Sequence, residues 1–201
     1  MEEAFTTIYQ KNRWGNGSGS GSNMTIDNKK YIELLESILK DYKIKKICDI
    51  GCGDWQFSQN INFGNYSYLG IDCVKSVIDE NIKNHQKKNI KFQHKSVNEN
   101  FIPKGYDLII IKDVIQHWED KDILSFMQEV INNNKYVFST NGYKFMRDKT
   151  KNNLEKRDIN NQYRYHPVDI DKYPLNALDM NCLFRNERRA KQMLLLQKMI
   201  D

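Results

Sequence analysis

The sequence lacks any long hydrophobic run. Its 201 residues contain no stretch near the roughly 20 consecutive apolar residues that a membrane-spanning helix requires. Residues 1–4 carry neither a basic region nor an apolar signal core. These two absences predict a chain with no membrane span that stays in the cytoplasm.

The sequence is also poor in cysteine. Its 4 cysteines are scattered, and the first three lie in or just after apolar runs. A disulfide framework or a structural metal site would instead show regularly spaced cysteines. We therefore expect reduced thiols and no stabilising cross-link.

The chain does contain enough apolar material for one core, with 39% hydrophobic and 11% aromatic residues. We predict one domain over residues 1–201, in which 1–23 form an N-terminal Gly/Ser-rich lid or arm. By composition alone the run 15–23 fits a plain linker equally well. The net charge of +5 suits either a polyanionic partner or a solvated lysine-rich surface, and the interspersed acidic residues favour the surface.

Short apolar runs alternate with helical stretches, a pattern typical of a parallel sheet with crossover helices. Before them, apolar residues at a 3.6-residue period predict a helix that ends near Asp41. The expected strands cover 47–50, 66–71, 90–94, 106–111 and 136–139, and the expected crossover helices cover 74–86 and 120–132. The apolar runs 177–184 and 193–196 suit an antiparallel hairpin, although the second run could equally begin a terminal helix. The prediction is a doubly wound α/β fold whose mostly parallel seven-stranded sheet ends in an antiparallel C-terminal hairpin.

The strongest local signal is the turn that follows the first strand, Asp49-Ile-Gly51-Cys-Gly53. Two glycines at this spacing let the backbone turn sharply and approach a ligand. The second strand ends in Asp72, about 20 residues later, where an acid accepts both ribose hydroxyls of a bound nucleotide. A dinucleotide-binding turn would need a third glycine, which this one lacks, while a bare tight turn would not need the acid.

These residues resemble the first motif of the class I S-adenosylmethionine-dependent methyltransferases, an acid, one residue and then Gly-x-Gly. More closely, the chain resembles a subgroup associated with polysaccharide and glycan biosynthesis. That subgroup combines an N-terminal Trp-Gly and Ser/Gly-rich run, a Cys-Gly-Asp-aromatic turn and an Asp-Val-x-x-His segment after strand four. The resemblance covers nearly the whole chain and makes the Gly-Ser run look native.

The resemblance implies S-adenosyl-L-methionine as the cofactor. The residues that it places around the cofactor are Trp14, Ser20, Asp49, Gly51, Cys52, Gly53, Asp72, Cys73, Ser96, Val97, Lys112 and Asp113. Among these the glycine turn would line the methionine part, Asp72 the ribose, and Lys112 with Asp113 the sulfonium side. Ser96 stands where the family usually has an acid that contacts the adenine amine. Trp14 and Ser20 would close over the cofactor, or else belong to an ordinary surface loop.

Catalysis by such a protein needs little covalent chemistry, because the sulfonium methyl is already activated and transfer depends on positioning. A hydroxyl acceptor does need a base, and His117, just after the fourth strand, is the candidate. The alternative is a packed polar histidine. Asp113 and His117 would share a helix face if this segment were helical, which suits an oriented base or two metal ligands. No third ligand is evident, so we predict no metal.

The acceptor site is predicted from polar and aromatic residues in the last third of the chain: Asn141, Tyr143, Tyr163, Arg164 and His166. Such side chains can stack on and hydrogen-bond a sugar, although a polar surface loop has the same composition. The leading hypothesis is O-methylation of a sugar or glycan hydroxyl. Methylation of RNA is a less favoured alternative, because the Asn/Asp-Pro-Pro-Tyr motif of amine-modifying enzymes is absent. A non-catalytic cofactor-binding subunit is the third. No oligomeric state follows from the sequence.

Overall fold

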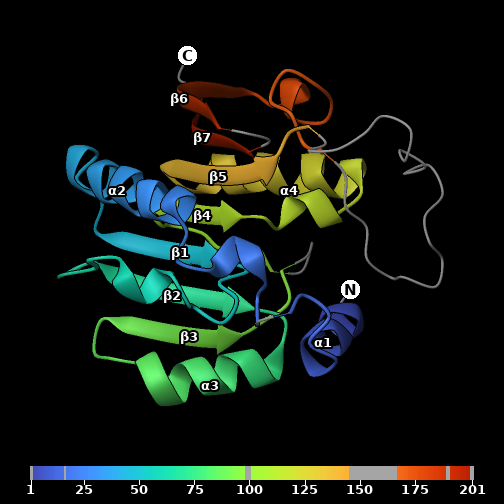
Figure 1. The fold of residues 1–201 in the computed structure, drawn as a ribbon. Helices are drawn as coiled ribbons and strands as arrows, with labels where there is room; N and C mark the ends of the chain where they lie inside the picture. The colour runs from blue at the N-terminus through green and yellow to red at the C-terminus, as the bar shows by residue number, and fades with distance from the viewer. Residues whose placement is uncertain (1, 16, 98–100, 145–166, 189–190, 200–201) are drawn as a thin grey trace. The chain divides into compact units, whose positions relative to one another are not determined.

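The computed structural model describes residues 2–15, 17–97, 101–144, 167–188 and 191–199. The chain divides into two compact units, residues 1–97 and 98–201 (Figure 1). Each unit is built around parallel strands. The two are described in turn.

The first unit contains three parallel strands in the order β3-β2-β1. They are β1 (Lys46–Ile50), β2 (Ser67–Asp72) and β3 (Ile90–His94). Their arrowheads point the same way in Figure 1, so their carboxyl ends meet at one edge, and α1 (Glu2–Gln10) lies beyond that edge. The predicted strands are confirmed here to within a residue or so at each end.

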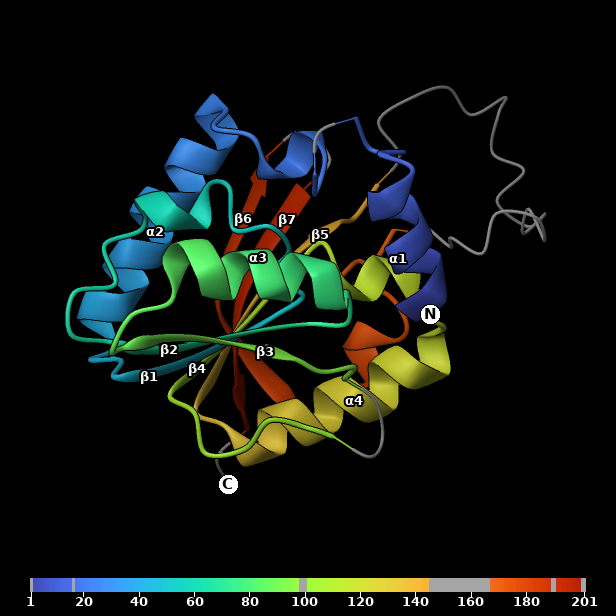
Figure 2. The same cartoon turned by 90° about the horizontal axis from the view of Figure 1, so that it is seen from below.

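Two longer helices cover the strands of the first unit. α2 (Ile26–Asp41) buries an apolar stripe that includes Leu35 and Leu39. Its first turn is capped by the Thr25 hydroxyl, which accepts a hydrogen bond from the Asn28 backbone N–H at 3.3 Å. α3 (Lys75–His85) connects β2 to β3. Figure 2 shows both helices on the same side of β1–β3.

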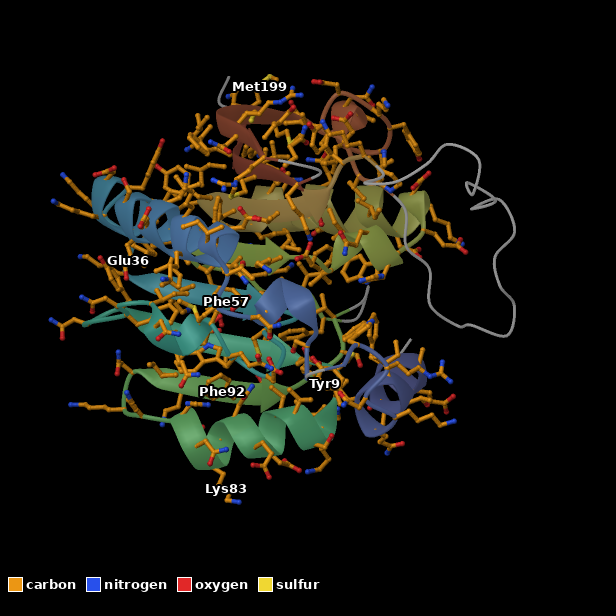
Figure 3. All side chains as sticks on the ribbon, in the orientation of Figure 1. Tyr9, Glu36, Phe57, Lys83, Phe92 and Met199 are labelled. Carbon is orange, nitrogen blue, oxygen red and sulfur yellow. The ribbon has the colours of Figure 1, made fainter. Side chains whose placement is uncertain are left out.

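The connection between β1 and β2 contains no α-helix, only the 3-10 turn η2 (Ser58–Asn60). An aromatic cluster holds it instead. The Trp55 ring stacks on Phe63 at 5.8 Å and meets the edge of Phe92, labelled in Figure 3, at 5.2 Å. Trp55 has a left-handed backbone, with φ of 57°. Such strain persists in a bulky residue only where surrounding contacts enforce it, and Trp55 is buried.

The second unit pairs β4 (Leu108–Lys112) in parallel with β5 (Tyr136–Gly142). α4 (Asp120–Asn133) packs on this sheet and joins the two strands. The antiparallel hairpin of β6 (Met180–Arg188) and β7 (Lys191–Lys198) extends the sheet, with β7 beside β5. The predicted hairpin is confirmed and the alternative terminal helix is wrong.

The described residues hold the seven strands of the predicted doubly wound fold, parallel except for the C-terminal hairpin. Two strand starts were placed too early: β4 begins at Leu108 and β6 at Met180, because the 3-10 turn η5 (Leu175–Ala177) precedes β6. Over the described ranges, the helices are too short or too polar to cross a membrane.

Candidate functional site

The glycine turn at the end of β1 is tied to the end of β2 by backbone hydrogen bonds. Gly51 and Gly53 have φ of 71° and 57°, a left-handed conformation that glycine adopts without strain. The N–H groups of Gly51 and Cys52 donate to the Ile71 carbonyl at 2.8 and 3.1 Å. The Gly53 N–H donates to Asp72 Oδ2 at 3.1 Å. The sequence therefore brings the predicted turn and the predicted acid into direct contact.

Asp72 lies at the carboxyl end of β2 and is only 9% exposed. Burial raises the pKa of its carboxyl group, and backbone N–H donors, among them those of Val74 and Gly53, offset part of that rise. The Val74 N–H reaches Oδ1 at 2.9 Å. A carboxylate can accept about four hydrogen bonds, so the backbone N–H donors of Gly53, Cys73 and Val74 leave about one acceptor position, enough for one hydroxyl of a ribose.

Asp49 is the acid of the first motif, and a hydrogen bond from Tyr68 holds its side chain in place. Tyr68 donates its hydroxyl hydrogen to Asp49 Oδ2 at 2.7 Å, and Trp55 Nε1 donates to the Tyr68 oxygen at 2.9 Å. Burial and the Asp49 carboxylate raise the pKa of Tyr68, so the phenol stays protonated as the donor. This network fixes the end of β1 and, with it, the start of the turn.

The N-terminal arm docks on the glycine turn through Ser18. The Ser18 N–H donates to Asp54 Oδ2 at 2.8 Å, and the Asp54 N–H donates to Ser18 Oγ at 2.9 Å. Tyr9, labelled in Figure 3 beside the strand ends, shares a hydrogen bond of 2.6 Å with Ser18 Oγ. At Gly17 a Cβ would come within 1.8 Å of Asp54 Oδ2, so the Asp54 side chain would have to shift to admit any other residue. The arm thus contacts the turn, and its action as a lid stays a prediction.

The sequence singled out two residues in the arm, Trp14 and Ser20. Trp14 packs its ring against Phe5 and Tyr9, with centroids 6.0 and 5.7 Å apart. Ser20 begins the 3-10 turn η1 (Ser20–Ser22), and its side chain lies outside the described part of the chain. Whether either contacts a cofactor stays a prediction.

At the carboxyl end of β3 the first helix contributes an acid. Glu2 Oε2 accepts the Ser96 hydroxyl at 2.8 Å, and Glu2 Oε1 lies 3.3 Å from His94 Nε2. The same His94 nitrogen lies 3.0 Å from the Cys73 carbonyl oxygen. Two of the residues predicted near an adenine, Cys73 and Ser96, thus take part in these contacts, and Val97 follows them half-buried. Whether any of the three contacts a cofactor stays a prediction.

In the second unit, Asp113 follows β4 and binds two ammonium groups. Lys112 Nζ lies 3.1 Å from Oδ2, and Lys191 Nζ, from β7, bonds Oδ1. Burial would raise the pKa of the Asp113 carboxyl, but the two lysines together lower it to about 2. The carboxylate is therefore ionised and weakly basic at neutral pH.

The segment from Asp113 to His117 is not an α-helix, so the condition under which the two residues would share a helix face is not met. Asp113 has a left-handed backbone, with φ of 61°, and only η3 (Ile115–His117) is helical, as a 3-10 turn. The turn is held by Gln116, whose Oε1 accepts from the Gly142 N–H at 3.0 Å. His117 remains half-buried just after β4.

Two of the predicted acceptor residues fall in the described part of the second unit. Asn141 is 2% exposed and donates from Nδ2 to Ser139 Oγ at 2.7 Å, while its Oδ1 has no hydrogen-bond partner among the described residues. Tyr143 is half-buried just after β5. Three further predicted acceptor residues lie outside the described residues: Tyr163, Arg164 and His166.

A family model for a methyltransferase domain matches residues 41–194, more than three quarters of the chain. The match spans the glycine turn, Asp72 and the Asp113 to His117 segment. The chain belongs to the class I S-adenosylmethionine-dependent methyltransferases. S-adenosylmethionine is accordingly its methyl donor.

Two curated relatives match parts of the methyltransferase. The ubiquinone biosynthesis O-methyltransferase of Pelagibacter ubique is 33% identical over 101 residues, 44% of this chain and 42% of the relative. The mitochondrial ubiquinone biosynthesis O-methyltransferase of Schizosaccharomyces pombe is 25% identical over 138 residues, 63% of this chain and 50% of the relative. The methyltransferase thus spans half or less of the length of these relatives.

Solved structures share the fold of the methyltransferase at low sequence identity. Magnesium protoporphyrin IX methyltransferase from Synechocystis PCC 6803 with bound SAH has a TM-score of 0.64 and 12% identity, covering 85% of this chain and 83% of that one. An S-adenosylmethionine-dependent methyltransferase from Clostridium acetobutylicum has a TM-score of 0.63 and 13% identity, covering 96% and 97%. These likenesses confirm the Rossmann-like methyltransferase fold.

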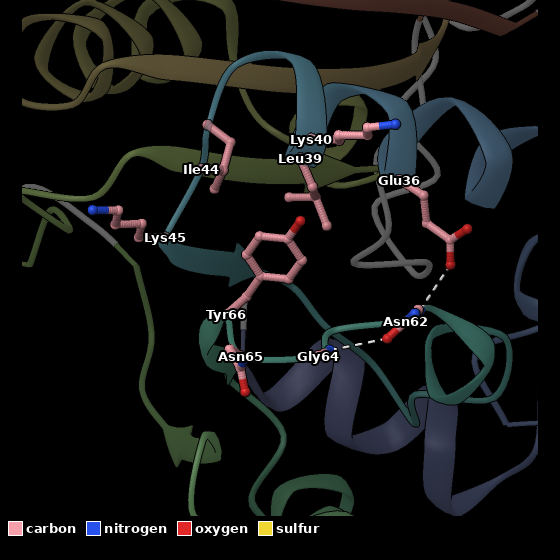
Figure 4. A pocket seen from close by; sticks show the side chains of 9 residues that line it. All are labelled: Glu36, Leu39, Lys40, Ile44, Lys45, Asn62, Gly64, Asn65 and Tyr66. Atoms are coloured by element: carbon pink, nitrogen blue, oxygen red, sulfur yellow. Dashed lines mark hydrogen bonds between the residues drawn. The ribbon is translucent and has the colours of Figure 1, made fainter.

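A hollow of about 480 Å³ lies at the opposite, amino ends of β1 and β2 (Figure 4). Tyr66 extends beneath Leu39 and Ile44 there, and Lys45 lies at its rim. Because the glycine turn and Asp72 lie at the carboxyl ends of the same strands, this hollow is not part of the cofactor region.

Within the described ranges no group of three or more metal-ligating side chains occurs, and the absence of a metal stays a prediction.

Within each unit, the sequence did not reveal the residues that contact the candidate residues from distant segments. Tyr9, Ser18 and Glu2 come from the arm, and Lys191 comes from the C-terminal hairpin. Asn81 on α3 was missed as well, although its Nδ2 donates to the Gly53 carbonyl at 2.7 Å. In the sequence, Asn81 falls on the apolar side of the predicted helix. A buried amide there needs a hydrogen-bond partner, and this was the signal that could have indicated it.

Proposed function

We propose that the methyltransferase transfers the methyl group of S-adenosylmethionine to a hydroxyl group. The observation that carries this proposal is that both curated relatives are named as O-methyltransferases. A half-buried histidine directly after β4 supports it, because a hydroxyl acceptor must lose a proton during transfer.

The cofactor is proposed to lie across the carboxyl ends of the strands in the first unit. The glycine turn after β1 would hold the methionine part, and Asp72 at the end of β2 would accept a ribose hydroxyl. The residues present suit this ligand, since the three backbone donors on Asp72 leave its carboxylate one more acceptor position. In addition, Asp54 Oδ1 is buried without a hydrogen-bond partner among the described residues. A buried acceptor of this kind favours a ligand that brings donors, such as an ammonium group.

His117 is proposed as the general base. The imidazole would accept the hydroxyl proton as the acceptor oxygen attacks the methyl carbon and the carbon–sulfur bond breaks, which leaves the thioether product. Asp113 is a poor alternative base, because two lysines hold its pKa at about 2. Positioning of donor and acceptor supplies the rest of the acceleration.

Two classes of acceptor hydroxyl follow from different observations. The subgroup that the sequence resembles implies a sugar or glycan hydroxyl, bound by Asn141, Tyr143 and the three candidates at 163–166. The two curated relatives favour a phenolic hydroxyl, since both are named for ubiquinone biosynthesis. A phenol, with a pKa of about 10, also gives up its proton to an imidazole more readily than an alcohol does.

The test measures release of S-adenosylhomocysteine with three panels: free and nucleotide-linked sugars, catechols and hydroxylated benzoates, and RNA oligonucleotides. Turnover on either of the first two panels supports O-methylation and names the acceptor class. Turnover on RNA alone, with strong salt dependence, would replace the proposal with nucleic-acid methylation. Cofactor binding without turnover on any panel would instead favour a non-catalytic subunit.

The role of His117 is tested with the best acceptor. His117→Ala should lower kcat by about 100-fold to 10,000-fold and leave S-adenosylhomocysteine binding unchanged. The acid limb of the wild-type pH–rate profile should be absent in the variant. An unchanged kcat, or a profile that keeps its acid limb, would show that His117 is a packed polar residue.

A further inference from the structure

We propose that Glu2 recognises the adenine ring of the cofactor by accepting a hydrogen bond from its 6-amino group. This inference rests on the proposed cofactor position across β1–β3. Its starting point is the position of the Glu2 carboxylate at the carboxyl end of β3. The strand itself has no acidic residue at that end. Glu2 lies 94 residues away in sequence from Ser96, to which it is hydrogen-bonded.

The position of Glu2 follows from the order of the strands. β2 lies between β1 and β3, and neighbouring strands are about 4.8 Å apart. A ligand laid along the carboxyl edge passes from the glycine turn after β1 to Asp72 after β2, and then to the end of β3. If the methionine part lies at the turn and the ribose at Asp72, the base must extend toward β3. His94, the last residue of β3, contacts Glu2 there.

The contacts of Glu2 hold its carboxylate in place without saturating it. Ser96 Oγ donates to Oε2 at 2.8 Å, and His94 Nε2 lies 3.3 Å from Oε1. Each carboxylate oxygen can accept two hydrogen bonds, so each retains an acceptor position. His94 also lies 3.0 Å from the carbonyl of Cys73, the residue after Asp72. The Glu2 carboxylate is therefore within two hydrogen-bond lengths of the backbone beside the proposed ribose site.

The chemistry of the carboxylate selects an amine. An ionised carboxylate only accepts hydrogen bonds, and the adenine 6-amino group only donates them. A base with a carbonyl oxygen at position 6 would place two acceptors against each other. Glu2 would therefore distinguish adenine from hypoxanthine, and it would do so from the arm rather than from the strand.

The experiment compares two ligands by calorimetry: S-adenosylhomocysteine, and S-inosylhomocysteine, in which an oxygen replaces the 6-amino group. The wild type should prefer the adenosine ligand. Glu2→Ala should weaken that ligand by about tenfold, the usual effect of one charge-assisted hydrogen bond at a partly exposed site. The same substitution should leave the inosine ligand unchanged or bind it better. Glu2→Gln, which keeps a neutral acceptor, should fall between.

Glu3→Ala is the matched control, because Glu3 is an exposed acid in the same first turn of α1. It should leave both affinities unchanged. Equal weakening of both ligands by Glu2→Ala would overturn the inference and assign Glu2 a structural role in docking α1. An unchanged preference for adenosine would overturn it as well. A wild type that binds neither ligand would refute the proposed cofactor position itself, a result that the variants cannot imitate.

Discussion

The charge on Asp113 should stabilise the folded protein, and its neutralisation provides a measure of how much. Burial opposes ionisation of this carboxyl, but Lys112 and Lys191 prevail and lower its pKa from 3.8 to about 2. A shift of that size corresponds to about 2 kcal/mol of stability. Asp113→Asn should therefore lower the free energy of unfolding at pH 7 by about 2 kcal/mol.

The stabilisation has a defined pH dependence. Because the folded-state pKa of Asp113 lies below its ordinary value, the contribution is complete above about pH 4 and is lost as the pH falls toward 2. The difference between wild type and Asp113→Asn should thus be constant from pH 5 to 8 and shrink below pH 4. Asparagine is the right replacement, because it tolerates the left-handed φ of 61°. Asp113→Ala should lower the free energy of unfolding by about 1 kcal/mol more than Asp113→Asn, because alanine is disfavoured in the left-handed conformation.

Urea unfolding monitored at several pH values measures these differences, whereas guanidinium would screen the charges. Asp171→Asn is the control, because Asp171 forms an exposed ion pair with Arg185. The decrease in the free energy of unfolding in this variant should be smaller and should disappear in high salt. A difference between wild type and Asp113→Asn that stays flat from pH 7 to 3 would refute the electrostatic reasoning. So would a loss at pH 7 that matches the Asp171 control.

Three further substitutions test the packing and the arm. Tyr68→Phe removes a buried hydroxyl with two hydrogen bonds and should lower the free energy of unfolding by about 2 kcal/mol, measured by urea unfolding. Gly70→Ala places a Cβ 2.8 Å from the Phe92 ring and should cost about 1–3 kcal/mol; if the clash is the cause, adding Phe92→Leu restores part of the loss. Gly17→Ala directs a Cβ at Asp54 and should weaken S-adenosylhomocysteine binding in calorimetry with little change in thermal stability. Unchanged affinity would separate the arm from the cofactor site.

The local parts of the fold could be predicted because they depend on short-range patterns. Four consecutive aliphatic residues make up most of the fourth strand, and the 3.6-residue period of α2 is visible without a structure. The turn at Gly51 and Gly53 follows from the backbone freedom of glycine. Asp72 follows from its place at the end of the next strand. These features need no knowledge of distant residues.

The remaining features depend on contacts between distant segments or on unusual backbone angles. Lys191 meets Asp113 across 78 residues, and no periodicity links them. The left-handed backbone at Asp113 also excludes the helix on which a shared face with His117 would depend. Aspartate is among the residues that adopt this conformation more often than most, but the sequence alone does not show at which position it does so.

The paired hydrogen bonds between Ser18 and Asp54 join two segments that are 36 residues apart. Such a link is reciprocal: a ligand that steadies the turn must steady the arm by the same free energy. A cofactor bound at the turn should therefore slow amide hydrogen exchange in residues 17–19. Sequence changes in the arm, in turn, would tune cofactor affinity without touching the cofactor. Homologous enzymes with the same turn could differ in affinity through this arm alone.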